Sequence, residues 1–182
     1  MFSLSLYVGI AIQMIGFNLQ KINKYILDRW YHKLILIGVI LGLILRITML
    51  FSFDLWRDEA FSVLTAQESI ARIFTILLQD TQPPLHILSL KIWTAILGDS
   101  IFVVRLLSIL FSTAGFYLGY KLLESLQVVP WGKLFYVLLV ATHPLLVFHS
   151  VEARPYGLLI FTTLGFLYFY LLYWQKFSFT RL

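Results

Sequence analysis

Two adjacent carboxylates stand where a strongly apolar stretch gives way to polar sequence. Asp58 and Glu59 lie in the segment LWRDEAFSV, directly after the apolar run 34–53. Carboxylates at such a boundary are partly desolvated, which suits them to act as a general base or as ligands of a divalent metal ion. A purely structural alternative is that the two acids complement the dipole of the helix that begins there.

A second group of polar side chains surrounds two prolines in DTQPPLH. The prolines fix the start of the following helix and hold Asp80 and Gln82 in an extended loop, just ahead of Pro83 and His86. A rigid loop can preorganise a binding site, and it can equally be a structural turn.

The third segment, HSVEARPYG, places Glu152 and Arg154 before a helix start. A guanidinium can bind a phosphate through paired hydrogen bonds. The alternative is an arginine that extends from the bilayer toward water with a glutamate beside it.

Two arginines fall inside or at the edge of apolar runs, where an unpaired charge costs several kcal/mol. Arg46 and Arg105 therefore need a partner or a watery cavity, and Asp99 and the acidic loop are the candidates for Arg105. The histidines show no spacing typical of a metal site.

The composition is that of an integral membrane protein. The 182 residues are 60% hydrophobic and 13% charged, with a mean hydropathy of +0.86, outside the usual range of soluble domains. A spanning helix needs about 20 apolar residues. The chain has no cysteine, which excludes thiol chemistry. The predicted spans are 34–53, 101–123, 131–149 and 156–174, with Met1–Gln20 as a fifth span or an interfacial helix.

Charge sorting predicts the topology. With basic clusters on the cytoplasmic side, the loop 52–100 and the turn 149–157 lie outside with seven of the nine acidic residues. The net charge of +5 then belongs to cytoplasmic loops and indicates no nucleic-acid partner. Within the outer loop we predict an amphipathic helix over 59–79, broken near Ser69, and a short interfacial or re-entrant helix over 83–97.

Four motifs in this order resemble the N-terminal part of the GT-C membrane glycosyltransferases, in the branch of the protein O-mannosyltransferases and aminoarabinose transferases. They are LRITMLFSFDLWRDEAFSV, DTQPPLHILSLKIW, GDSIFVVRLLS and HPLLVFHSVEARPYGLL, within residues 33–175. The resemblance implies an all-α GT-C-like partial bundle of four or five transmembrane helices, with interfacial helices in the first outer loop. Residues 1–32 precede it as an apolar helix and a basic cytoplasmic segment, and 176–182 follow as a cytoplasmic tail.

The resemblance also implies a function: transfer of a sugar from a polyprenyl-phosphate donor to an acceptor at the outer face, with inversion. We expect a multi-pass protein of the bacterial inner membrane. No cofactor is required, and a divalent metal on Asp58 and Glu59 is left open. Asp58 carries over as the leading general base, with Glu59 beside it. The residues expected to bind substrate are Asp80, Gln82, Pro83, His86, Arg105, Glu152, Arg154 and Tyr156. The family often has histidine in place of Gln82 and glutamine in place of Val151.

Other functions are open at this stage. The chain is shorter than such enzymes, so we expect a truncated or split member with a partner that supplies the missing helices. It could also be a non-catalytic assembly partner that binds lipid-linked sugar, which glycine faces without partners in the chain would favour. These faces are Gly38 with Gly42 and Gly115 with Gly119. A transporter fragment with Glu152 and Arg105 along a pathway is the third alternative.

Overall fold

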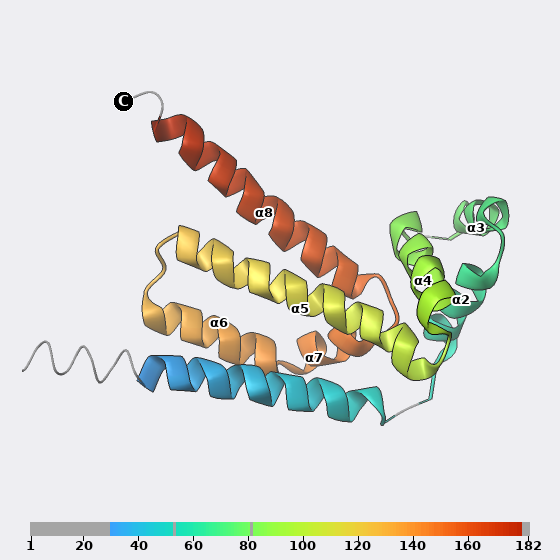
Figure 1. The fold of residues 1–182 in the computed structure, drawn as a ribbon, viewed down its shortest axis with the longest axis horizontal. Helices are drawn as coiled ribbons and strands as arrows, with labels where there is room; N and C mark the ends of the chain where they lie inside the picture. Colours follow the sequence, from blue (N-terminus) through green and yellow to red (C-terminus); the bar gives the residue numbers. More distant parts are fainter. Residues whose placement is uncertain (1–29, 53, 81, 180–182) are drawn as a thin grey trace, which may run out of the picture. The chain divides into compact units, whose positions relative to one another are not determined.

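The computed structural model describes residues 30–52, 54–80 and 82–179, and all regular structure in these ranges is α-helical. The first twenty residues, expected to span or to lie at the interface, fall outside the described residues. The described residues from Gly38 onward form one compact unit, and every contact below lies within it. The helix Trp30–Leu50 is followed by α2 Arg57–Gln67, α3 Ile70–Leu77, α4 Pro84–Leu97, α5 Ile101–Ser125, α6 Pro130–Thr142, α7 Pro144–Val151 and α8 Tyr156–Phe179 (Figure 1).

Three of the described helices are long and apolar enough to cross a membrane: Trp30–Leu50, α5 and α8. The all-α membrane fold predicted from the sequence is therefore confirmed. The span predicted over 131–149 is instead two helices, α6 and α7, bent by 59° at His143, and it makes a fourth span only if the bent pair crosses as one. Pro144 explains the break, because proline has no N–H to continue the helical hydrogen-bond ladder.

The break in this span is joined to the first span by a buried arginine. Without an N–H on Pro144, the carbonyl of Val140 has no partner in the helix. Arg46, 4% exposed, donates from Nη2 to that carbonyl at 3.0 Å and from Nη1 to the Gly42 carbonyl at 3.0 Å. The arginine in the first span thus compensates the proline break between α6 and α7.

Glycines allow the spanning helices to approach closely. A Cβ on Gly115 would lie 2.8 Å from the backbone of Phe161, and one on Gly42 would lie 3.1 Å from Ala141. These contacts join α5 to α8 and the first span to α6, and α5 and α8 run in the same direction (Figure 1). The glycine faces therefore have partners within the chain, which removes the observation that would have favoured an assembly partner.

The helices between the first span and α5 follow the prediction closely. The expected break near Ser69 separates α2 from α3, and the Ser69 side chain caps α3 by accepting from the N–H of Arg72. The fourteen residues of α4 rise about 21 Å, short of the ~30 Å hydrocarbon core. Lys91 of α4 donates to the carbonyls of Ala66 and Glu68, which holds α4 against the end of α2.

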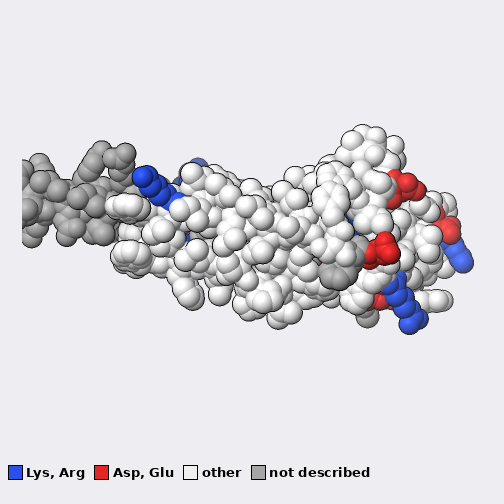
Figure 2. All heavy atoms as spheres, turned by 90° about the horizontal axis from the view of Figure 1, so that it is seen from below, with Lys and Arg blue, Asp and Glu red and all other residues white. Residues whose placement is uncertain are grey.

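A small apolar core fixes these outer-loop helices to α5. Ile73 of α3, Ile87 of α4, Val104 of α5 and Ala153, in the turn before α8, are each fully buried in one cluster. This core brings the N-terminus of α2 and the turn 152–155 to the same end of α5. Acidic side chains gather at the end of the molecule where α2 to α4 lie, next to a broad uncharged surface (Figure 2).

Candidate functional site

Glu59 is the central side chain of the candidate site. It is 1% exposed, and its carboxylate accepts from Nε and Nη2 of Arg105 at 2.9 and 2.7 Å. It also accepts from the backbone N–H groups of Ala153 at 2.8 Å and of Trp56 at 3.4 Å. As the third residue of α2, Glu59 can reach back to the N-cap residue Trp56, which directly precedes the helix, as in a capping box. One carboxylate thus joins α2, α5 and the turn before α8.

Arg105 has its donors directed at the protein. Besides Glu59, it donates from Nη1 to the Leu50 carbonyl at 3.2 Å and from Nη2 to the Asp54 carbonyl at 3.1 Å. Its partner is therefore Glu59 of the acidic loop. The other candidate, Asp99, instead accepts from the side chain of Gln67 at 3.2 Å, because it lies at the far end of α2.

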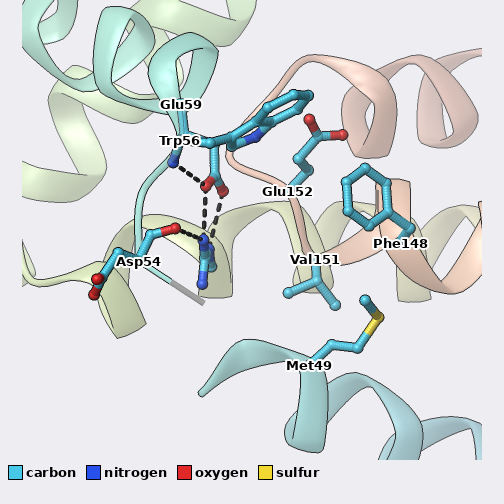
Figure 3. Close-up of a pocket in the computed structure, with 8 residues that line it drawn as sticks. Met49, Asp54, Trp56, Glu59, Phe148, Val151 and Glu152 are labelled. Atoms are coloured by element: carbon cyan, nitrogen blue, oxygen red, sulfur yellow. Dashed lines mark hydrogen bonds and ion pairs between the residues drawn. The ribbon is translucent and has the colours of Figure 1, made fainter. Parts of the chain in front are cut away.

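A cavity of about 240 Å³ lies against this ion pair (Figure 3). The accessible lining is mainly apolar, with the ion pair of Glu59 and Arg105 among the lining residues, and the close-up shows Glu152 next to Trp56 and Phe148. The remaining lining residues are Met49, Asp54 and Val151.

Asp58 and Arg154 meet beside the ion pair. Nη2 of Arg154 lies 3.6 Å from Oδ2 of Asp58, with 18% and 47% of the two side chains exposed. This distance allows attraction between the charges but exceeds an ordinary hydrogen bond. The Nε atom of Arg154 is buried without a hydrogen-bond partner. Unlike the pair of Glu59 and Arg105, these two side chains keep hydrogen-bonding capacity for a substrate.

The Pro-Pro loop packs beneath the turn that carries Arg154. Gln82 is buried and accepts from the Ser62 hydroxyl of α2 at 3.3 Å. His86 is 1% exposed, and both ring nitrogens lack a hydrogen-bond partner. Burial lowers the pKa of His86 to about 4, an effect that the charge of Arg154 reinforces and the backbone of Ala153 opposes. His86 is therefore a neutral residue beneath the turn at pH 7.

Glu152 pairs with a histidine that the sequence motifs did not assign to the site. Its Oε2 lies 2.8 Å from Nδ1 of His149, and the His149 ring stacks on Tyr156 with centroids 4.4 Å apart. Because α7 ends at Val151, the i,i+3 spacing brings these two side chains together at the helix end.

The structure brings most of the predicted residues to one end of α5, with different surroundings for each. Asp58 and Arg154 are adjacent, Glu59 is paired with Arg105, and Gln82 and His86 lie buried beside them. Pro83 is exposed at the start of α4, and Asp80 is half-buried in the preceding loop. The predictions missed Trp56, Phe148 and Met49 of the cavity, since an apolar residue before or within a helix gives no chemical signal in a sequence.

Clustered metal ligands are absent from the part of the chain that the structure describes: no three His, Asp or Glu side chains there are placed to hold an ion. Asp58 and Glu59 each face an arginine. These two carboxylates therefore do not form a cation site by themselves.

Comparison with known families settles what the chain is related to. A family model described as dolichyl-phosphate-mannose-protein mannosyltransferase matches residues 81–182, more than half of the chain. The chain belongs to this family. The resemblance inferred from the ordered motifs is thereby confirmed, and the protein is a GT-C-type glycosyltransferase by family. Neither a curated protein nor a solved structure gives a further match.

The matched range divides the candidate site. It contains the Pro-Pro loop, Arg105 and the turn from Glu152 to Tyr156, and it begins after Asp58 and Glu59. The roles of the two acids in this mannosyltransferase-family chain therefore rest on their geometry.

Proposed function

We propose that this chain transfers a sugar from a polyprenyl-phosphate donor to an acceptor hydroxyl at the outer face of the membrane. The observation that carries the proposal is the pair formed by Asp58 and Arg154, a half-exposed carboxylate beside a guanidinium with an unused buried N–H. The pair supplies the two charges that such a transfer needs, and because they lie 3.6 Å apart, the two side chains must separate around the substrate for an in-line displacement.

In the proposed reaction, the oxygen of the acceptor hydroxyl forms a bond to C1 of the sugar, and Asp58 accepts the proton that this hydroxyl loses. The bond between C1 and the phosphate oxygen breaks in the same step, and the electron pair leaves with the polyprenyl phosphate. Arg154 donates hydrogen bonds to that phosphate as its negative charge develops. A single displacement of this kind inverts the configuration at C1.

Glu59 and Arg105 have a positioning role in this proposal. Both oxygens of Glu59 accept hydrogen bonds from buried donors, so Asp58 is the acid that remains for the chemistry. The ion pair holds the α2 terminus against the turn that carries Arg154.

The outward orientation is supported by the distribution of lysines. Lys121 near the end of α5, Lys133 near the start of α6 and Lys176 near the end of α8 lie at the opposite ends of these helices from the site. With lysines on the cytoplasmic side, the site faces outward. A partner that supplies further helices belongs to the same proposal, and co-purification from membranes tests it.

The test compares two acid-to-amide variants of the full chain in its native membrane. Asp58→Asn should lower sugar transfer from a polyprenyl-phosphate donor by roughly 10²- to 10⁴-fold, the usual contribution of a general base. Glu68→Gln, an exposed acid at the end of α2, is the matched control and should transfer at the wild-type rate. Undiminished turnover by Asp58→Asn, with equal protein levels, would remove Asp58 from the chemistry.

A further inference from the structure

Four aromatic rings run in a row from the cavity to the start of α8. The ring centroids of Trp56 and Phe148 lie 6.2 Å apart, those of Phe148 and His149 lie 5.3 Å apart, and those of His149 and Tyr156 lie 4.4 Å apart. Trp56 precedes α2, the next two residues belong to α7, and Tyr156 begins α8. Trp56 and Phe148 are 48% and 38% exposed, although rings of this size gain most from burial.

A buried carboxylate lies within this row. Glu152 is 5% exposed and lines the cavity, and Oε2 is bonded to His149. Figure 3 shows its carboxylate next to the Trp56 and Phe148 rings. Oε1 accepts no hydrogen bond from the described residues, so it can accept one from a ligand.

We propose that Trp56, Phe148 and Glu152 form the subsite for the sugar ring of the lipid-linked donor, with His149 holding Glu152 in place, an inference that rests on the proposed function. A pyranose has apolar C–H faces and a rim of hydroxyl donors. Aromatic rings match the first surface, and the second oxygen of Glu152 matches the rim.

The size of the cavity supports a single sugar ring as the occupant. Drug-sized ligands occupy pockets of about 300–1,000 Å³, whereas this cavity is about 240 Å³. Arg154 lies two residues after Glu152, so the sugar and its phosphate would contact the same turn.

The subsite also limits the class of sugar. The buried carboxyl group of Glu152 favours a neutral or amino sugar, because its oxygens can accept hydrogen bonds from hydroxyl or ammonium groups. A uronic acid would bring a second carboxylate beside it, and like charges repel.

The experiment measures binding by titration calorimetry of the full chain in lipid nanodiscs. The probes are farnesyl phosphate and farnesyl phosphomannose. The wild type should bind the mannosylated probe more tightly than the bare phosphate. Trp56→Ala and Glu152→Gln should remove that preference, on the order of tenfold, and leave the affinity for farnesyl phosphate unchanged. Trp56→Phe, which keeps a ring, should retain most of the preference.

Two control variants separate this inference from the proposed function. Trp131→Ala, at the exposed start of α6, should bind both probes like the wild type. Arg154→Gln should weaken the binding of both probes, because both carry a phosphate. A wild type that binds both probes equally, or a Trp56→Ala variant that keeps the full preference, overturns the sugar subsite while the phosphate contact stands. Failure of the wild type to bind either probe overturns the proposed function and the subsite together.

Discussion

Neutralising Glu59 should destabilise the folded protein, whereas neutralising its neighbour Asp58 should not. Glu59 and its partner Arg105 are 1% and 5% exposed, and removing one member of a buried ion pair typically costs about 3–5 kcal/mol. Glu59→Gln keeps one carbonyl oxygen to accept hydrogen bonds, so we expect the lower end, about 3 kcal/mol. Asp58 lies 3.6 Å from Arg154 and is partly exposed to solvent. An ion pair of this kind contributes about 0–1 kcal/mol to stability.

Thermal unfolding of the purified chain in detergent, followed by circular dichroism, measures this difference. For a chain of this size, a loss of about 3 kcal/mol lowers Tm by roughly 6–12 °C. Arg105→Gln should cause a loss at least as large. The double variant Glu59→Gln/Arg105→Gln should lose less than the sum of the two single variants, since no unpaired charge remains buried.

The reasoning fails if Glu59→Gln keeps the wild-type Tm and still loses sugar transfer as completely as Asp58→Asn. That result would place Glu59 in the chemistry. Additive losses in the double variant would equally contradict a direct interaction between Glu59 and Arg105.

Three further outcomes follow from the packing. The pKa of His86 is lowered to about 4 from 6.5, so the unfolded chain binds the extra proton first as pH falls. The free energy of unfolding should therefore drop by up to about 3 kcal/mol from pH 6.5 to pH 4, and His86→Leu should flatten this slope in Tm measured against pH. Arg46→Met should cost less stability in a Pro144→Ala background than alone, because an alanine at position 144 can donate its N–H to the Val140 carbonyl. Equal costs in the two backgrounds would contradict the pairing of Arg46 with this carbonyl. Gly115→Ala should lower Tm by forcing α5 from the α8 backbone, while Gly165→Ala, with a nearest neighbour at 3.4 Å, should keep it.

Local sequence signals predicted the elements that position the site. Apolar length predicted the first span, α5 and α8, since a helix must cover the thickness of the hydrocarbon core. Ser69 and the two prolines predicted where the outer-loop helices begin, because caps and missing N–H groups act within one turn of the chain. Pro144 indicated a kink within the span predicted over 131–149, and the structure has two helices there, α6 and α7, bent by 59°.

The sequence by itself also determined which residues carry charge in an apolar chain, and it named Asp58, Glu59, Arg105, Glu152 and Arg154. Only the tertiary structure decided their pairing: Glu59 with Arg105 in the interior, and Asp58 with Arg154 at its edge. The physical reason is that adjacent residues of a helix point in directions about 100° apart. Glu59 therefore faces the core and pairs with Arg105 of α5. Asp58 faces outward and keeps its capacity to bind a substrate.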